Sequence, residues 1–564
     1  MPTRKRTSAS RVAAQAPASR GGLSGSPLQE YAMIAGVSLL LSWLLSLAFP
    51  YGITTEETTG YFAVTQGFSW TAQNLLDWWR TPFLGFVYKA FLHLFANPSI
   101  AIFWLHAGVS ALNIGLVLAV CRKICPTRAA ASAIAWTYLA MEVLTMRSFY
   151  FDTQIASDTF YGRFGLLSVL LILYGWLQGK RLPVLTGYAV IGVLVAMRSA
   201  GLALLPVWIP FAVVAFRKSG SGPRTRIAAT TLCIALTLVP IALWSARNAA
   251  VYGQFRPTSY ASFQLLSRAL PLLRDTDRVF DDPATNERFI STVRTFERRI
   301  DIGKFDHMEA WGRIGRHNIY FPWDNILPPD GPFRFLRDSA IPAQDRDESA
   351  LNSSKNLFLI DGAALPVALR ILQNHPLAYA RLVAGDYLQL FDISQGIQAR
   401  KAEVFTADAA DSYDQITTPL LYPPDGKPDL SRINATVRGA WWLVTQNGIV
   451  LAGRAALERS MPFAVHAIAL CAVVFLFYRK RTPSASAYAS VIVLLFATVS
   501  LHNLLVSVTQ PPMYRFCIPG AGIANLIFVL GAAALPKFLS ILSQSSPAVR
   551  LFGSRPRSHR TKRG

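Results

Sequence analysis

Two adjacent carboxylates, Glu56 and Glu57, follow the first long apolar run of the chain and are candidates for acid–base chemistry. Their neighbours are Thr, Gly and Tyr, so the pair lies where a membrane span would meet water. Partial burial at such a boundary can raise the pKa of a carboxylate towards neutrality, which suits a general base. A loop charge exposed to solvent explains the same pair, and both interpretations stay open.

A third carboxylate, Asp158, begins a later apolar run directly after Ser157. Ionisable groups beside a membrane are costly unless they are solvated or used, so Asp158 is a candidate site residue. Ser and Asp also favour the N-cap position of a helix. A cap and a functional carboxylate are equally good explanations, and one residue can serve as both.

Three cations are placed where they could bind a phosphate. Arg247 follows an apolar run, Arg515 precedes the last one, and Lys89 interrupts an amphipathic aromatic stretch over residues 83–95. Interfacial Arg and Lys side chains often only extend to the lipid headgroups. These three lie on the side of the membrane opposite to most basic residues, which favours a phosphate-bearing ligand.

Membrane helices must position these residues. Of the 564 residues, 52% are hydrophobic and 15% are charged, against roughly 25% charged in soluble domains. Ten apolar runs predict an all-α polytopic membrane protein of about ten transmembrane helices. The runs lie near residues 31–49, 99–120, 129–146, 164–178, 182–197, 200–216, 227–246, 462–478, 486–507 and 516–541.

The charges are segregated along the chain, which predicts orientation. The formal net charge is +23, yet residues 248–460 hold 24 Lys/Arg and 25 Asp/Glu, a net of −1. The remaining basic residues concentrate in the tails and in short connections, which the positive-inside rule places in the cytoplasm. Both termini are therefore predicted to be cytoplasmic. The pattern predicts membrane lipids as partners and no nucleic acid.

The predicted organisation has five parts. They are a disordered basic tail (1–30), a membrane domain of about seven spans (31–247) with its first outer loop at 50–98, a large extracytoplasmic domain (248–460), a membrane domain of about three spans (461–541) and a basic tail (542–564). The large domain is predicted to be mixed and mainly helical, with helices over 285–299 and 365–390.

Four segments resemble the GT-C glycosyltransferases, in particular the bacterial relatives of the protein mannosyltransferases and of the lipid A aminoarabinose transferase. Residues 56–61 are similar to the acidic first-loop element of the family, with Glu57 in place of the usual Asp. Residues 80–84 resemble its Arg/His-x-Pro-Leu helix start, and 239–255 its Pro-Trp…Arg-Asn…Phe-Gly element. Residues 514–519 are similar to its Arg-Tyr…Pro segment, with the first two residues inverted.

The resemblance implies inverting transfer of a sugar from a polyprenyl-phosphate donor. The acceptor would be a glycolipid, polysaccharide or protein, and the site would face the periplasm from the bacterial inner membrane. It implies that Arg247, Arg515 and Lys89 hold the leaving phosphate. Phosphate-bearing donors of this kind need no nucleotide-binding loop, and no Gly-rich phosphate loop is evident in the sequence.

The resemblance also assigns roles to the acids. Glu57 would take the proton of the acceptor, with Glu56 as its neighbour. Asp158 would orient the acceptor or hold a divalent metal, Mg or Mn. The sequence leaves two other functions open, a transporter or flippase and a polymerase or ligase of lipid-linked glycans. Transporters favour ionisable groups at mid-membrane and duplicated halves, and the sequence has neither pattern.

Overall fold

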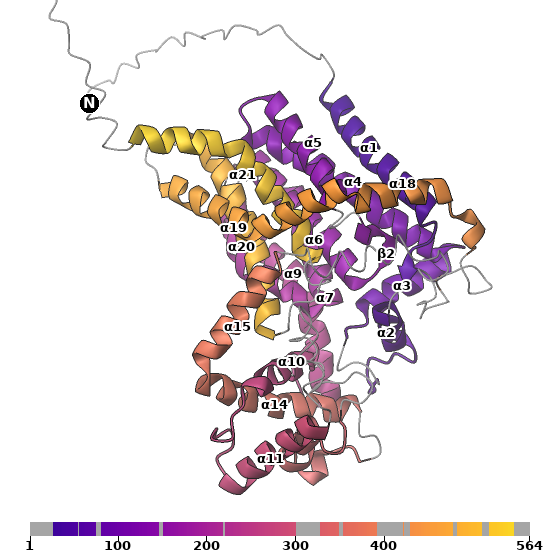
Figure 1. Ribbon diagram of the computed structural model, residues 1–564, viewed down its shortest axis with the longest axis vertical. Helices are drawn as coiled ribbons and strands as arrows, with labels where there is room; N and C mark the ends of the chain where they lie inside the picture. The colour runs from indigo at the N-terminus through magenta and orange to yellow at the C-terminus, as the bar shows by residue number, and fades with distance from the viewer. Residues whose placement is uncertain are drawn as a thin grey trace, which may run out of the picture.

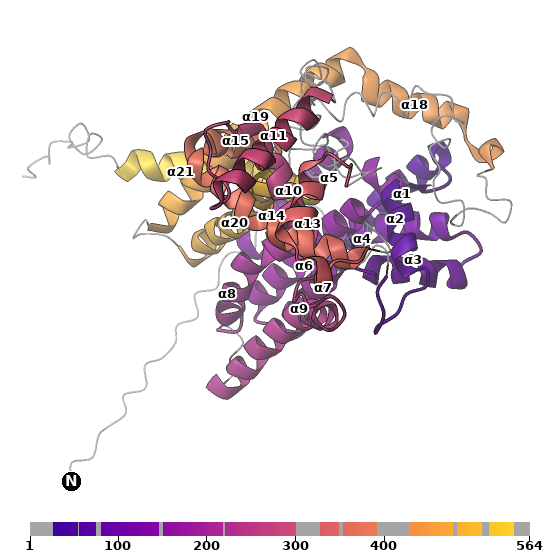
Figure 2. The same cartoon turned by 90° about the horizontal axis from the view of Figure 1, so that it is seen from below.

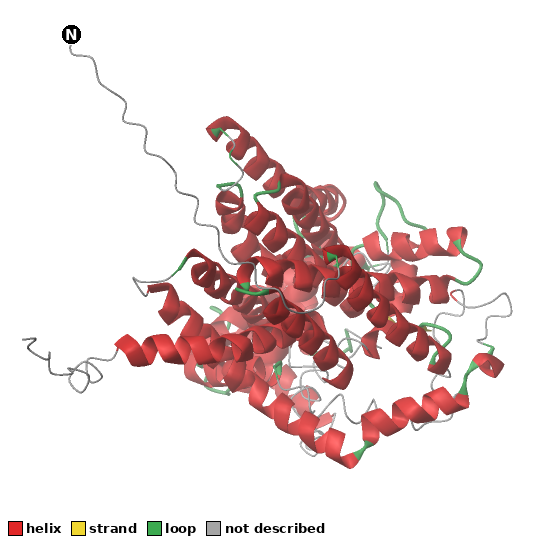
Figure 3. Cartoon of the chain, turned by 90° about the horizontal axis from the view of Figure 1, so that it is seen from above, coloured by secondary structure: helices red, strands yellow, loops and turns green. Residues whose placement is uncertain are grey.

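The computed structural model describes most of the chain between residues 26 and 545. The residues outside the description are 1–25, 55, 75–79, 146–149, 218–219, 221, 300–326, 349–352, 392–420, 422–428, 478–481, 510–517 and 546–564. The described part contains 18 α-helices, short 3-10 turns and one pair of two-residue strands (Figure 3). It is a polytopic helical membrane protein, so the predicted all-α class is confirmed there.

Each of the ten apolar runs falls on a helix. Seven described helices are long and apolar enough to cross a membrane, and six of them match predicted spans: α1 (Pro27–Ala48), α4 (Pro98–Ile124), α6 (Ser157–Gln178), α9 (Pro223–Tyr252), α19 (Gly448–Phe477) and α20 (Pro483–Thr509). The other four runs fall on α5 (Arg128–Thr145), α7 (Arg181–Met197), the turn η2 (Ser199–Leu204) with α8 (Leu205–Ala215), and α21 (Ile518–Ser545). A helix satisfies every backbone hydrogen bond within one segment, as a spanning element in lipid requires.

Local sequence signals set where these helices begin and end. The side chain of Ser26 caps α1 in a reciprocal capping box with Gln29, so α1 begins at Pro27, ahead of the apolar run. Gly179 and Gly253 end α6 and α9 in the left-handed conformation, which glycine adopts without steric cost.

Contacts between helix ends show that α1, α4, α5 and α6 alternate in direction. At one end of the bundle, Glu30 of α1 pairs with Arg122 of α4 and accepts a hydrogen bond from Ser132 of α5. At the other end, β1 (Ile53–Thr54), which follows α1, pairs with β2 (Gln154–Ile155), which precedes α6. We call this second end the strand end. The ion pair with Arg122 also explains why Glu30 can lie among the basic connections.

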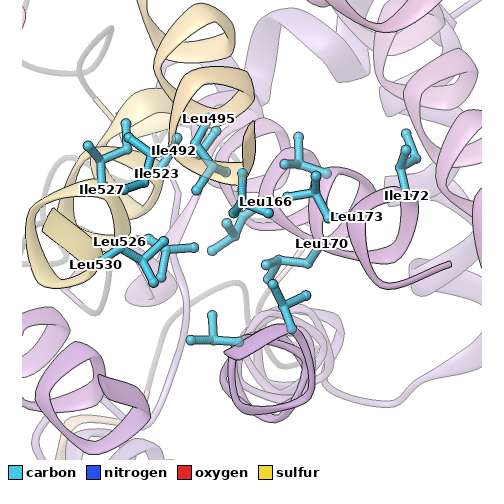
Figure 4. Packing of buried hydrophobic residues seen from close by; sticks show 14 of the residues in the cluster. Leu166, Leu170, Ile172, Leu173, Ile492, Leu495, Ile523, Leu526, Ile527 and Leu530 are labelled. Carbon is cyan, nitrogen blue, oxygen red and sulfur yellow. The ribbon is translucent and has the colours of Figure 1, made fainter. Parts of the chain in front are cut away.

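The core of the membrane body is aliphatic. Leucine and isoleucine side chains of α6, α20 and α21 pack together, among them Leu166, Leu170, Leu495, Ile523 and Ile527 (Figure 4). Because lipid is as apolar as these side chains, close packing is what holds such helices together.

A lobe with its own core extends from the membrane body (Figure 1). It contains α10 (Tyr260–Ala269), η3 (Leu270–Leu272), α11 (Pro283–Arg299), α13 (Pro332–Ala340), η5 (Ala343–Asp345) and α14 (Ser354–Asn374). Helix α14 is the seventh helix long enough to span. Its apolar side chains, such as Leu357 and Ile360, are buried in the lobe core, so it is a core helix there.

Both stretches of this domain that were predicted to be helical are helical, and the second contains a break. Helix α11 matches the helix predicted over 285–299. The helix predicted over 365–390 is two helices, because α14 ends at Asn374 and α15 (Pro376–Gln389) starts anew. The break follows from Pro376, which lacks the N–H needed to continue a helix and disfavours helical backbone in the preceding residue.

Helix α15 returns from the lobe to the membrane body. The Tyr387 hydroxyl lies 2.9 Å from His466 Nε2 and donates to Ser500 Oγ at 3.0 Å, so α15 contacts both α19 and α20. Beyond it, η7 (Leu430–Arg432) and α18 (Ala435–Gln446) follow. Figure 2 shows α18 and α19 along one edge of the molecule, and α18 contacts α1 through the hydrogen bond from Asn434 N to Leu47 O.

Candidate functional site

The strand pair brings two of the candidate acidic segments together. The strands are parallel, with Ile53 opposite Gln154 and Thr54 opposite Ile155. Each strand is followed at once by a helix: α2 (Glu56–Thr65) after β1, and α6 after β2. Because parallel strands end at the same edge, the chain enters α2 and α6 from neighbouring positions. The Thr58 hydroxyl donates to the Ile155 carbonyl and fixes this arrangement.

The candidate acids are therefore at neighbouring helix starts. The backbones of Glu56 and Glu57 form the first turn of α2, and their side chains lie outside the described residues. Asp158 is in the first turn of α6 and is 1% exposed. The N-termini of both helices present partial positive charge at this place, which favours a bound anion.

Asp158 is paired with an arginine that the sequence analysis did not assign. Arg198 directly follows α7, and its Nη1 donates to Asp158 Oδ1 and, at 2.7 Å, to Ser157 Oγ. The Arg198 side chain is 15% exposed. Asp158 is not the N-cap residue, because α6 is capped at Ala156 without a side-chain hydrogen bond.

A second arginine joins the same region. The Arg80 guanidinium lies over the ring of Tyr61, with Cζ 4.4 Å from the ring centroid. Its neighbour Thr81 donates to the carbonyls of Ala196 and Met197, the latter at 3.1 Å. The start of α3 (Phe83–Leu94) is thereby held against α2 and the end of α7.

Four segments thus form a closed ring of contacts at the strand end: residues 53–61 (of which 55 is not described), 80–82, 154–158 and 196–198. Close packing supports it at Gly85 of α3, where an added Cβ would lie 2.2 Å from the Tyr61 carbonyl oxygen. We call these four segments the acid ring. It holds carboxyl-bearing residues, two guanidinium groups and two helix N-termini.

Arg247, predicted from the sequence to bind phosphate, is held by the first loop. Its guanidinium donates to the carbonyls of Ser69, Trp70 and Ala72 at 2.8, 3.2 and 2.6 Å. Its Cζ also lies 5.0 Å from the ring centroid of Trp244. Arg247 fastens the loop after α2 to the end of α9, and a phosphate would have to compete with these carbonyls.

Of the other two predicted cations, the structure describes Lys89 and does not describe Arg515. Lys89 of α3 is half-buried, and its Nζ donates to the Thr65 carbonyl at 2.5 Å, at the last turn of α2. A cation there satisfies a carbonyl that the helix leaves free. Arg515 lies outside the described residues. The helix before it, α20, reaches the strand end, where the His502 and Tyr161 rings are 5.5 Å apart.

Arg198 was not among the site residues predicted from the sequence, and Arg80 had no predicted role of its own. Arg198 separates two predicted spans on the side opposite to the basic connections, which is the criterion that singled out Arg247. Applied to every predicted connection, it would have found Arg198. Nothing in the sequence shows the contact of Arg198 with Asp158, because the two residues are 40 positions apart.

The described side chains do not form a metal site at the acid ring. Asp158 is ion-paired with Arg198, and in the described part of the chain no group of three or more His, Cys, Asp or Glu residues could hold a metal ion. The divalent metal implied by the resemblance stays a prediction, and the mechanism proposed below does not use it.

A concavity of about 590 Å³ lies on the lobe, at the start of α11. Its lining is largely charged or polar and includes Asp275, Glu287 and Arg294. Small-molecule pockets are mostly apolar with a few placed polar groups. None of its lining residues belongs to the acid ring, so it is separate from the candidate site.

No family model matches the chain, and no curated protein matches it. Among solved structures, the chain is similar to ArnT from Cupriavidus metallidurans, crystallised bound to undecaprenyl phosphate. The TM-score is 0.31 and the identity is 14%, over 85% of this chain and 78% of that chain. A TM-score this low carries no argument, so the function below is argued from residues and contacts.

Proposed function

We propose that the protein is a GT-C-type glycosyltransferase that moves a sugar from polyprenyl phosphate to an envelope acceptor, with inversion at the sugar carbon. One observation carries the proposal. The parallel strand pair sets the acidic start of α2 beside Asp158 and Arg198, at one end of a membrane body. The end of a membrane body is where a donor held in lipid and an acceptor in water would meet.

In the proposed reaction, Glu57 removes a proton from a hydroxyl or amine of the acceptor. The freed electron pair attacks the anomeric carbon from the face opposite the phosphate. The bond between that carbon and the phosphate oxygen breaks, and its electrons leave on polyprenyl phosphate. The proton stays on Glu57 until solvent removes it. Glu56 is the neighbouring charge, and Asp158 orients the acceptor.

The leaving phosphate needs positive groups where its charge grows. Arg198 and Arg80 belong to the acid ring itself, and a guanidinium has the planar fork that suits a phosphate. At Arg198 a phosphate would have to compete with the Asp158 carboxylate. The starts of α2 and α6 add backbone N–H groups. Arg247, Lys89 and Arg515 remain predicted phosphate ligands, and the first two would act from α9 and α3.

The function is tested by comparing cells with and without the gene. Mass spectrometry of envelope glycans and glycolipids should show one sugar missing from one acceptor in the deletion strain. The purified protein should restore that sugar when given the matching polyprenyl-phosphate donor. Accumulation of an unflipped lipid-linked glycan would instead indicate a flippase, and loss of long chains with all sugars present would indicate a polymerase or ligase.

Ten spans are proposed, with both termini in the cytoplasm and the lobe in the periplasm, because the basic connections partition that way. Single cysteines at Thr127 and Ser291, in a background without the five native cysteines, test this in intact cells. Both positions are exposed in the structure. An impermeant thiol reagent should label Ser291→Cys and should label Thr127→Cys only after lysis. The reverse pattern would contradict the orientation.

A further inference from the structure

Arg163 of α6 lies one and a half turns along the helix from Asp158 and binds carboxylates of two other segments. Its Nε and Nη2 donate to Asp152 Oδ1 and Oδ2 at 2.6 and 2.7 Å, and its Nη1 donates to Glu142 Oε2 at 3.3 Å. All three side chains are buried. One guanidinium therefore joins α5, α6 and the turn η1 (Tyr150–Thr153).

On one side, this network reaches the acid ring. Asp152 stands in η1, two residues before β2 begins. Besides Arg163, it is held by Ser110 of α4, whose hydroxyl donates to Asp152 Oδ2 at 3.0 Å. The anchored turn fixes where β2 starts. β2 in turn carries Ile155, the residue whose carbonyl accepts the hydrogen bond of Thr58 in α2.

On the other side, the network reaches the last helix. Glu142 Oε1 accepts a hydrogen bond of 2.8 Å from Asn525 Nδ2 in α21. Close packing supports this contact at Gly522, where an added Cβ would lie 3.1 Å from Tyr138 Oη. Asn525 belongs to α21, so the network contacts the last described helix of the chain.

Stability alone does not account for such a network. Two carboxylates and one guanidinium are removed from water, and well-packed apolar side chains in place of a buried ion pair are often neutral or stabilising. What a forked, directional contact adds over apolar packing is one defined relative position. One of the segments it ties together, η1, leads directly into β2 and the acid ring.

We propose that Arg163 is a positioning residue that fixes β2, and with it the acid ring, relative to α5 and α21. The proposal rests on the function proposed above for its kinetic consequence. Its structural consequence can be measured without any activity.

Arg163→Lys keeps the charge and loses the fork. We expect kcat to fall about 10²-fold, the size of effect that a misplacement of about 1 Å produces, while the KM for the lipid donor changes less than about threefold. Glu142→Gln keeps an acceptor for Asn525, so it should lower kcat less than Arg163→Lys does. An unchanged kcat in folded Arg163→Lys protein would overturn the proposal.

The matched control is Arg122→Lys. Arg122 pairs with Glu30 at the opposite end of the membrane body, and its side chain is 11% exposed. Arg122→Lys should lower the thermal unfolding midpoint by about as much as Arg163→Lys does, and it should leave kcat within about twofold of the wild type. If both variants lower kcat in proportion to lost folded protein, Arg163 is only a stabilising residue.

Hydrogen exchange separates failure of this inference from failure of the proposed function. Backbone amides of residues 150–158 should exchange faster in Arg163→Lys than in the wild type, and not faster in Arg122→Lys. If the wild type transfers no sugar, the proposed function is wrong, and exchange alone decides on positioning. Unchanged exchange of this segment would then overturn the inference.

Discussion

Glu57→Gln is expected to lower the rate of sugar transfer by about 10²–10⁴-fold, the usual cost of losing a general base. The amide keeps the size of the side chain and its hydrogen bonding, and it lacks a basic oxygen. The strand pair and the Thr58 contact are made by other residues, so the substitution leaves both in place. The measurement is turnover of a polyprenyl-phosphate sugar by purified protein, with the thermal midpoint recorded alongside.

Two neighbouring substitutions serve as controls. Glu56→Gln should cost less, and it should shift the acid limb of the pH–rate profile to lower pH, because Glu57 then ionises without an adjacent negative charge. Asp158→Asn weakens the contact with Arg198, so it should affect both stability and rate. Recovery of Asp158→Asn activity on adding Mg or Mn would indicate a metal role. Full turnover by Glu57→Gln would move the base to Glu56 or Asp158.

The second large effect is expected at Arg198. Arg198→Lys keeps the charge and loses the fork, and we expect a loss in kcat of about 10²–10³-fold, as when one donor to a developing anion is removed. The physical reason is that a phosphate takes two parallel hydrogen bonds from a guanidinium and only a point charge from an ammonium. The measurement is single-turnover transfer, with undecaprenyl-phosphate affinity determined separately.

A double variant separates phosphate binding from ion pairing at this position. Removing one partner of a buried pair leaves the other charge unpaired and costs about 3–5 kcal/mol, whereas replacing both is far less costly. Arg198→Met with Asp158→Asn should therefore fold. If Arg198 acts on the phosphate, the double variant transfers sugar far more slowly than Asp158→Asn alone. Recovered activity would show that Arg198 only balances Asp158.

The remaining cations are tested in the same binding assay. Arg247→Ala removes the donors to the Ser69 and Ala72 carbonyls, so a loosened loop should appear as faster hydrogen exchange near residues 66–74. Loss of undecaprenyl-phosphate affinity by Arg247→Ala, Lys89→Ala or Arg515→Ala would support the phosphate role predicted from the sequence. If all three variants keep the undecaprenyl-phosphate affinity of the wild type, these cations only hold the loop and contact the membrane surface.

Much of the architecture was predictable because membrane helices are encoded locally. A run of about twenty apolar residues forms a helix in lipid whatever its neighbours, since no other local structure satisfies the backbone there. All ten predicted runs fall on helices for this reason, and the helix start after Pro82 was also predictable. The break at Pro376 was a local signal too, and the sequence analysis overlooked it.

The lobe shows the limit of this local signal. Helix α14 has the length and composition of a span, and only its packing partners show that it is a core helix of the lobe. Hydropathy measures how apolar a segment is and not whether lipid or protein surrounds it.

The sequence by itself determined the membrane class, the helical runs and which residue types could carry the chemistry. Only the tertiary structure decided which of them meet. Residues 53–58 and 154–158 are about a hundred positions apart, and a strand pair of two residues each is too short to be recognised from its pattern. The contacts of Arg247 and of Arg198 were equally invisible. Such contacts depend on how whole helices pack against one another, and the spacing of residues along one chain carries no record of that packing.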